Sequence, residues 1–257
     1  MYSFKKMKKA TGTETVQLPS VAINFNGKQL DTEIEAFQTL KVSGRETISV
    51  ELETVDVRNG SLILDERLPH RELLVTYLMS SKSNTAFQSD YKALRKLLTS
   101  DDEIPITFKD EPNTVYFGRL ADFETVDDDS NTVIGTFKII CSSPFKYSNA
   151  VTTTGAVTVD TFYPTQPDSI TLTIGATTNK IKISHNGYNI SATGTFNAGA
   201  KVVLKFNKED MTMEVNGTDA TYMIDLNSDF ENFELKKGQS VTSSQGSISL
   251  VARERWL

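Results

Sequence analysis

The feature that most constrains this chain is an alternation of apolar and polar residues that recurs along most of its length. In the first half the alternation occupies four short segments: Ile48-Val50-Leu52, Val75-Tyr77-Met79, Ile104-Ile106-Phe108 and Phe137-Ile139-Cys141. Successive side chains of a β-strand point to opposite faces, so a period of two is typical of a strand with one buried face. We therefore predict that the chain is mainly β.

One segment departs from this period and predicts a single helix. Its apolar residues recur at the spacing of one helical face and are Phe87, Tyr91, Leu94 and Leu98. Thr85 and Gln88, three residues apart, fit a capping box at the helix start. We expect an amphipathic helix over residues 84–100 that packs against the sheet.

Two strands before and after a polar turn predict a hairpin in the first half. Residues 104–109 and 114–125 are both predicted to be strands, and Asp110, Glu111, Pro112 and Asn113 lie between them. Proline fixes φ, and aspartate and asparagine tolerate turn geometry. The edge backbone groups of such a hairpin can pair with a neighbouring sheet. These four residues are our candidate protein-interface residues.

Composition changes near Tyr147, where we place a boundary between a domain over residues 1–147 and a domain over residues 148–257. The second part is rich in Thr, Ser, Gly and Asn. It alternates at Ile170-Leu172-Ile174, Ile181-Ile183, Tyr188-Ile190, Val202-Leu204-Phe206, Met211-Met213-Val215 and Ile248-Leu250-Ala252. Turns are predicted at Asn186-Gly187, Asn216-Gly217 and Lys237-Gly238. Many short strands with frequent turns favour a β-sandwich.

The search for catalytic and metal-binding motifs is negative. His70 and His185 are the two histidines, and neither has a metal-ligand partner at short spacing. Cys141 alternates with Ile139, which predicts a buried thiol rather than a nucleophile. The run Asp127–Asp129 lacks the oxygen spacing of a calcium loop and is interpreted as a solvated turn. We expect no enzymatic activity, no cofactor and no metal.

Charge and hydropathy exclude several classes of protein. The net charge is −6, so the basic footprint of a nucleic-acid-binding protein is missing, and we interpret the lysines at positions 5, 6, 8 and 9 as solvated or as a partner contact. No apolar run approaches the roughly 20 residues that span a bilayer. The N-terminal residues lack the apolar stretch of a secretory signal, and the single cysteine is typical of a reducing cytosol. We expect no membrane association.

Four segments resemble the distal tail proteins (Dit) of long, non-contractile tailed phages of Gram-positive hosts. The first is the strand ending in Leu73-Leu74-Val75-Thr76-Tyr77-Leu78-Met79, followed by the helix. The second is Phe108-Lys109-Asp110-Glu111-Pro112 with the return strand over residues 115–120. The third is the stretch over residues 135–148, a closing strand that leads into Pro144-Phe145-Lys146-Tyr147 at the domain junction, and the fourth is the ending Arg253-Glu254-Arg255-Trp256 after an alternating strand. The resemblance covers essentially the whole chain.

The resemblance implies a specific architecture and set of partners. Members form a homo-hexameric ring from N-terminal domains that carry a sheet, a helix and a protruding hairpin, while a galectin-like β-sandwich projects outward. The ring joins the tail tube protein to the tail-associated hub protein and can hold receptor-binding or upper baseplate proteins. DNA passes through the channel without specific binding. The implied location is the virion tail tip, after assembly in the host cytoplasm.

Two other functions stay open. A carbohydrate-binding module that contacts host-wall saccharide would suit a β-sandwich with Asn- and Thr-rich loops. It would need an exposed aromatic platform, for which the candidates are Tyr163, Tyr188, Tyr222 and Trp256. A cell-wall hydrolase would need a convergent His, Cys and Asp set or a poised carboxylate pair, and neither is evident.

Overall fold

The computed structural model describes residues 18–46, 50–124, 130–207 and 210–257. The chain separates into two compact units: unit 1 holds the described residues up to Pro112 together with Phe117–Ser143, and unit 2 holds Asn113–Tyr116 together with Pro144–Leu257. The domain boundary expected near Tyr147 stays a prediction. The N-terminal lysines, Ile48 and the run Asp127–Asp129 lie outside the described residues.

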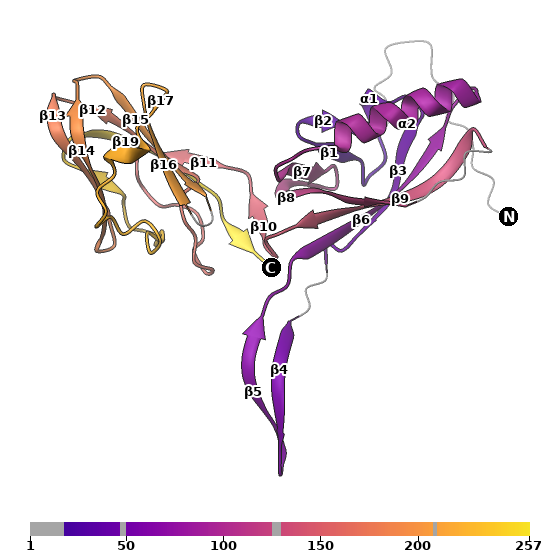
Figure 1. The fold of residues 1–257 in the computed structure, drawn as a ribbon, viewed down its shortest axis with the longest axis horizontal. Coiled ribbons are helices and arrows are strands. Elements are labelled where there is room, and N and C mark those ends of the chain that lie inside the picture. Colours follow the sequence, from indigo (N-terminus) through magenta and orange to yellow (C-terminus); the bar gives the residue numbers. More distant parts are fainter. Residues whose placement is uncertain (1–17, 47–49, 125–129, 208–209) are drawn as a thin grey trace. The chain divides into compact units, whose positions relative to one another are not determined.

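Unit 1 is built on one antiparallel sheet in which the strands follow the order β2-β1-β7-β8-β9-β6-β3 (Figure 1). Its strands are β1 (Ile23–Phe25), β2 (Lys28–Gln29), β3 (Phe37–Ser43), β6 (Arg71–Ser80), β7 (Ile104–Phe108), β8 (Glu111–Phe123) and β9 (Thr132–Cys141). A short helix, α1 (Leu30–Glu33), connects β2 to β3. The long central ladder joins β6 to β9 over ten residue pairs, from Arg71–Cys141 to Ser80–Thr132.

The alternation predicted for β6 and β9 is confirmed by burial. Leu73, Val75, Tyr77 and Met79 of β6 are all 0% exposed, whereas Leu74 on the opposite face is 39% exposed. A strand buried on one face alone needs a second layer to cover that face. The covering layer is the predicted helix.

The helix α2 (Asn84–Leu98) lies across the sheet of unit 1 (Figure 1). It buries Phe87, Leu94 and Leu98, which confirms the predicted apolar face. The expected cap at Thr85 is wrong, because the N-cap is Ser83. Ser83 has extended backbone angles, and its hydroxyl accepts a hydrogen bond from the Ala86 N–H at 3.2 Å.

Two strands of unit 1 stand outside its main sheet. β4 (Glu51–Val57) and β5 (Gly60–Arg67) pair only with each other and form a two-stranded hairpin that extends away from the sheet (Figure 1). Every residue of both strands is exposed. The strand predicted around Val50 and Leu52 is therefore present from Glu51 onward, but none of its described residues is buried.

Unit 2 is a β-sandwich, as its strand spacing predicts. One sheet has the order β11-β19-β12-β15-β16-β17 and the other the order β14-β13-β18. The strands of the two sheets are β11 (Val151–Thr153), β12 (Ser169–Ile174), β13 (Thr178–His185), β14 (Tyr188–Phe196), β15 (Lys201–Asn207), β16 (Asp210–Val215), β17 (Thr218–Asp219), β18 (Thr242–Ser243) and β19 (Gly246–Ala252). Outside these sheets, β10 (Lys146–Ser148) pairs with β20 (Arg255–Trp256) and with Thr114 and Val115 of β8. Among the residues described after Asn149, the helical structure is one 3-10 turn, η1 (Thr221–Met223).

The core of unit 2 forms between the two sheets. Leu172 and Leu204 from one sheet and Ile183 and Ile190 from the other belong to one buried cluster. The predicted Asn-Gly hairpins are confirmed: Asn186 and Asn216 adopt positive φ values of 48° and 52°, which asparagine followed by glycine tolerates in a two-residue turn. The likeness of this sandwich to a galectin stays a prediction.

Candidate protein-protein interface

The exposed hairpin is the most unusual surface of unit 1. Its register runs from Glu51–Arg67 at the root to Val57–Gly60 at the tip, with a bulge after Glu53. Gly60 adopts a φ of 98°, which closes the tip at a backbone conformation that side-chain-bearing residues avoid. The sequence signal for this turn is the dipeptide Asn59-Gly60 between two apolar segments. The sequence-based prediction missed it.

The hairpin and the residue before it carry seven large apolar side chains that are 45% to 57% exposed. They are Val50, Leu52, Val55, Val57, Leu62, Ile63 and Leu64. Single exposed apolar residues are ordinary, but a contiguous group marks an interaction surface. A two-stranded ribbon is also at best marginally stable in water by itself. The hairpin therefore has the features of an element that is completed by a partner.

An ion pair fixes the segment that leads from β3 to the hairpin. The Arg45 guanidinium donates to both carboxylate oxygens of Asp110, at 2.8 and 2.9 Å, and lies 3.7 Å from Glu111. The same guanidinium lies 5.1 Å from the centre of the Phe108 ring. The buried Arg71 donates to the carbonyl oxygens of Gly44 and Arg45, both at 2.9 Å. These contacts connect residues 44–46, which we call the approach segment of the hairpin, to the main sheet.

The expected turn over residues 110–113 differs from the observed one. The turn consists of Lys109 and Asp110, and Glu111 already begins β8, because β7 and β8 are neighbours in the main sheet. The long exposed hairpin of unit 1 is β4–β5, and Asp110 is bonded to Arg45 within the chain. Pro112 and Asn113 are exposed. The assignment of Asp110, Glu111, Pro112 and Asn113 to an interface stays a prediction.

The residues considered for catalysis do not converge. His70 is an exposed residue that lies 3.3 Å from the Glu72 carboxylate. His185 is buried, and its Nε2 accepts a hydrogen bond from the Lys236 N–H at 2.9 Å. Cys141 is a buried thiol on β9, as expected. No group of three His, Cys, Asp or Glu residues suited to a metal ion occurs in the described part of the chain.

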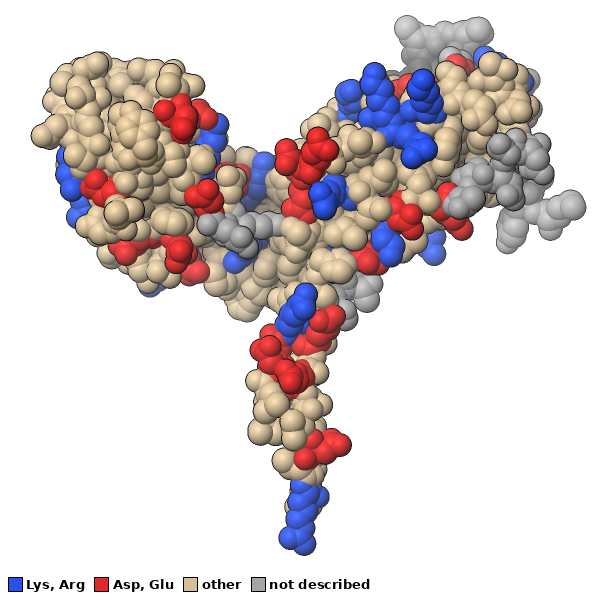
Figure 2. Space-filling view, in the orientation of Figure 1, with Lys and Arg blue, Asp and Glu red and all other residues tan. Residues whose placement is uncertain are grey.

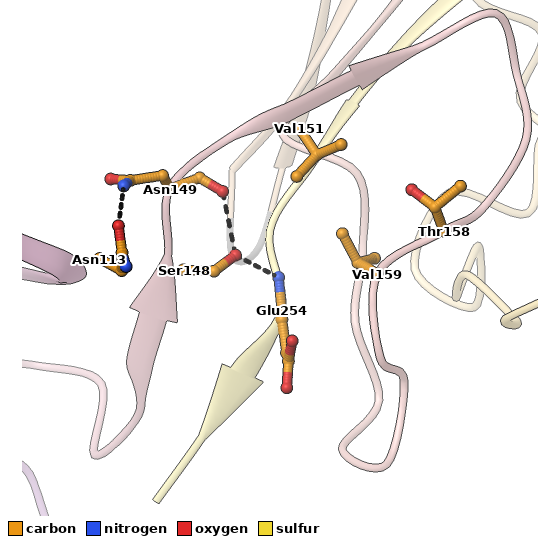
Figure 3. A pocket seen from close by; sticks show the side chains of 7 residues that line it. All are labelled: Asn113, Ser148, Asn149, Val151, Thr158, Val159 and Glu254. Atoms are coloured by element: carbon orange, nitrogen blue, oxygen red, sulfur yellow. Dashed lines mark hydrogen bonds between the residues drawn. The ribbon is translucent and has the colours of Figure 1, made fainter.

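A shallow hollow of about 330 Å³ lies on unit 2 (Figure 3). It is lined by Asn113, Ser148, Asn149, Val151, Thr158, Val159 and Glu254. The Glu254 N–H donates to the Ser148 hydroxyl at 2.9 Å, so part of the lining is already bonded within the chain. The lining includes no aromatic ring on which a sugar could stack and no pair of carboxylates.

The aromatic candidates for saccharide binding are scattered over unit 2. Tyr222 is 80% and Tyr188 is 37% exposed. Tyr163 is half-buried, with its ring 5.1 Å from that of Phe145, and Trp256 is half-buried on β20. None of them lines the hollow of Figure 3.

Among the described residues, no helix is both long and apolar enough to cross a membrane.

Two family models together match most of the chain. Residues 25–160 match the phage tail protein RIFT-related domain, and residues 160–256 match the siphovirus-type tail component, C-terminal domain. The first match alone covers more than half of the 257 residues. The two matches meet at residue 160, whereas the predicted domain boundary lies near Tyr147.

Relatives and solved structures agree with these matches. The distal tail protein of Bacillus phage SPP1 is 32% identical over 132 residues, which are 50% of this chain and 51% of that protein, so the alignment spans about half the length of the relative. The crystal structure of SPP1 Dit, described as a paradigm of the hub adsorption apparatus in phages that infect Gram-positive bacteria, has a TM-score of 0.71 at 24% identity. The comparison covers 92% of this chain and 99% of that one.

A second solved structure, the phage P2 baseplate in its activated conformation with Ca, shares the fold at a TM-score of 0.63 and 8% identity. That comparison covers 88% of this chain and 92% of the other. The shared fold is mainly β and antiparallel, as the sequence predicts. The two matched domains, together with the 32% identity to the SPP1 distal tail protein, show that the chain belongs to the distal tail protein family, whose members are structural components of phage tails and not enzymes.

Proposed function

We propose that this chain forms a hexameric ring at the tail tip, between the tail tube protein and the tail-associated hub protein. In this proposal residues 1–147 form the ring, and residues 148–257 project as a galectin-like sandwich to which receptor-binding or upper baseplate proteins attach. DNA passes through the channel, where a chain with a net charge of −6 does not hold a polyanion. Assembly takes place in the host cytoplasm, and the product is part of the virion.

The observation that carries this proposal is the β4–β5 hairpin. A closed ring requires heterologous contacts, in which one patch of each subunit meets a different patch of the next. The hairpin and Val50 before it present seven apolar side chains that their own chain leaves about half exposed. It thus supplies one side of a heterologous contact without any change to the core of unit 1.

The size of this surface indicates how strongly the ring would assemble. Full burial of one large apolar side chain stabilises by about 1.5–3 kcal/mol, so burying the exposed half of each of seven contributes roughly 7 kcal/mol in total. Association costs about 4–15 kcal/mol in lost freedom of motion. One hairpin contact is therefore weak by itself. We expect rings at high protein concentration or with the tube and hub proteins present.

Electron microscopy and mass measurement test the proposal. Rings with a central hole and about six times the mass of the chain are the expected result. The chain carrying Leu62→Ala and Ile63→Ala should lose assembly while its melting midpoint stays unchanged, because both side chains are exposed in the free chain. The control is Leu226→Ala, a fully exposed apolar side chain of unit 2. Monomers that persist in the presence of the tube and hub proteins would exclude the ring.

A further inference from the structure

The hairpin carries an excess of negative charge that its own chain only partly neutralises, through the ion pair of Arg67 with Glu51 at 4.0 Å. Between Glu51 and Arg67 there are five carboxylates and two arginines, a net charge of −3. Glu53 on β4 faces Asp65 on β5 directly across the ladder. Like charges in directly opposite positions destabilise an antiparallel pair. This placement suits a hairpin whose acidic part meets a cationic surface.

The acidic positions share one face of β4 with apolar ones. Because side chains alternate along a strand, Glu51, Glu53, Val55 and Val57 lie on the same face. The register adds Asp65 opposite Glu53. This face is therefore acidic near the root and apolar toward the tip. Figure 2 shows the acidic side chains gathered along the hairpin and a basic side chain at its tip.

The exposed face of α2 has the opposite charge. Lys92, Arg95 and Lys96 are exposed and lie within about 100° of the helix circumference, at 100° per residue. None of the three forms an ion pair among the described residues. The helix's one carboxylate, Asp90, is half-buried and accepts a hydrogen bond from the Ser81 hydroxyl at 2.7 Å. Figure 2 shows the basic side chains gathered over α2.

The cations of α2 also repel one another. Lys92 and Lys96 are four residues apart, and like charges at that spacing destabilise a helix. The helix dipole favours cations in the last turn, which accounts for Arg95 and Lys96 individually. It does not account for a patch of three without a counter-charge. Like charges therefore repel one another on both elements: carboxylates on the hairpin and cations on α2.

The dimensions of the two surfaces match. At about 3.3 Å per residue, the seven residues of β4 span about 23 Å, and at about 1.5 Å per residue the 15 residues of α2 span about 22 Å. Glu51 and Glu53 are separated by about 6.6 Å along the strand. Lys92 and Lys96 are separated by about 6 Å along the helix. Two carboxylates in one strand can therefore face two ammonium groups in one helix.

We infer that the acidic root of the β4–β5 hairpin binds the basic face of α2 in a second copy of this chain. The hairpin does not bind the helix of its own chain, since every residue of both strands is exposed. The contact is heterologous, so repeating it from copy to copy can close a ring. This inference rests on the proposed ring and names the surface that receives the hairpin.

Charge reversal with complementation tests the inference. The hairpin variant carries Glu53→Lys and Asp65→Lys, and the helix variant carries Lys92→Glu and Lys96→Glu. Each variant alone sets like charges against each other at every contact. We expect the concentration for half-assembly, measured by sedimentation velocity, to rise at least about tenfold for each.

Mixing the two variants is the decisive step. In a ring of alternating variants, each reversed hairpin meets a reversed helix and each native hairpin meets a native helix, so every contact regains opposite charges. We expect a 1:1 mixture, and also one chain that carries all four substitutions, to assemble as the unmodified protein does. Assembly of the unmodified protein should weaken between low and high salt, because exposed ion pairs are screened.

Matched controls separate this contact from a general effect of charge. Lys182→Glu with Lys201→Glu, and Glu231→Lys with Glu234→Lys, reverse exposed charges of unit 2. These variants should assemble normally, and circular dichroism should show that all variants remain folded. Reversed variants that assemble normally would overturn the inference, as would lost assembly that neither the mixture nor the fourfold variant restores. An unmodified chain that forms no ring with its tube and hub partners would instead reject the proposed function.

Discussion

The ion pair between Arg45 and Asp110 gives a measurable prediction about how the hairpin is held. Its two hydrogen bonds are 2.8 and 2.9 Å long, and the side chains are 12% and 32% exposed, respectively. Hydrogen bonds to charged groups contribute about 1.5–3 kcal/mol when protected, whereas exposed ion pairs contribute about 0.2–1 kcal/mol. Because one-third of Asp110 is exposed, we expect a coupling energy of about 1–2 kcal/mol.

A double-mutant cycle measures this coupling. Asp110→Ala removes the carboxylate, and Arg45→Met removes the guanidinium while keeping an unbranched side chain over Phe108. The readout is amide hydrogen exchange of β3 and β6, since the single tryptophan lies in unit 2 and does not report on unit 1. The double variant should lose about 1–2 kcal/mol less than the sum of the single losses.

The same cycle distinguishes an anchor from an incidental contact. If the pair holds the approach segment, exchange should also rise at Gly44 and Arg45, the residues whose carbonyl groups accept from Arg71. A coupling below about 0.3 kcal/mol, within the error of additivity, would refute the anchoring argument. In that case the contact between Arg45 and Asp110 would be an ordinary surface ion pair that does not hold the hairpin.

Two further predictions concern the buried parts of each unit. In unit 1, Gly135→Ala would place a Cβ 2.6 Å from the hydroxyl oxygen of the fully buried Tyr77, so thermal unfolding should show a loss of about 1–3 kcal/mol, which an added Tyr77→Phe should partly restore. In unit 2, burial lowers the pKa of His185. The folded protein therefore favours the neutral imidazole. The stability that this preference contributes is fully present above pH ~6.5 and should be lost as the pH falls through the lowered pKa, by about 1.4 kcal/mol for each unit between the unfolded-state and folded-state pKa values. Denaturant melts from pH 7.5 to 5 should show this loss, and His185→Gln, which keeps an acceptor without a titrating group, should not.

The sequence predicted most of unit 2 because several local signals agree there. β12, β13, β15, β16 and β19 all alternate, and two of the hairpins carry Asn-Gly turns. A period of two and a turn dipeptide together determine both the strand and its partner. In unit 1 the alternation also predicted β6 and β9, although no turn dipeptide joins them. Helix α2 was also predicted, and only its cap was misplaced, by two residues.

The hairpin was harder to predict, for physical reasons. Leu62-Ile63-Leu64 is a run of consecutive apolar residues without alternation, so β5 has no clear strand period. The alternation around Leu52 correctly indicates a strand, but a pattern does not specify which molecule covers its apolar face. The protruding element was consequently expected at Asp110–Asn113, where the turn chemistry is obvious. That turn is short and belongs to the main sheet.

The difference between the two units supports the hairpin as the interacting element. In unit 2 the apolar faces of both sheets meet in one buried cluster, so local pattern and final burial agree. In the hairpin they disagree: apolar side chains remain half exposed, and Glu53 faces Asp65. Sequences that specify one fold are locally consistent, and violations concentrate at functional sites. Exposed apolar side chains and a pair of like charges lower the stability of the isolated chain. Their presence is explained if the assembled state buries the apolar side chains and neutralises the charges.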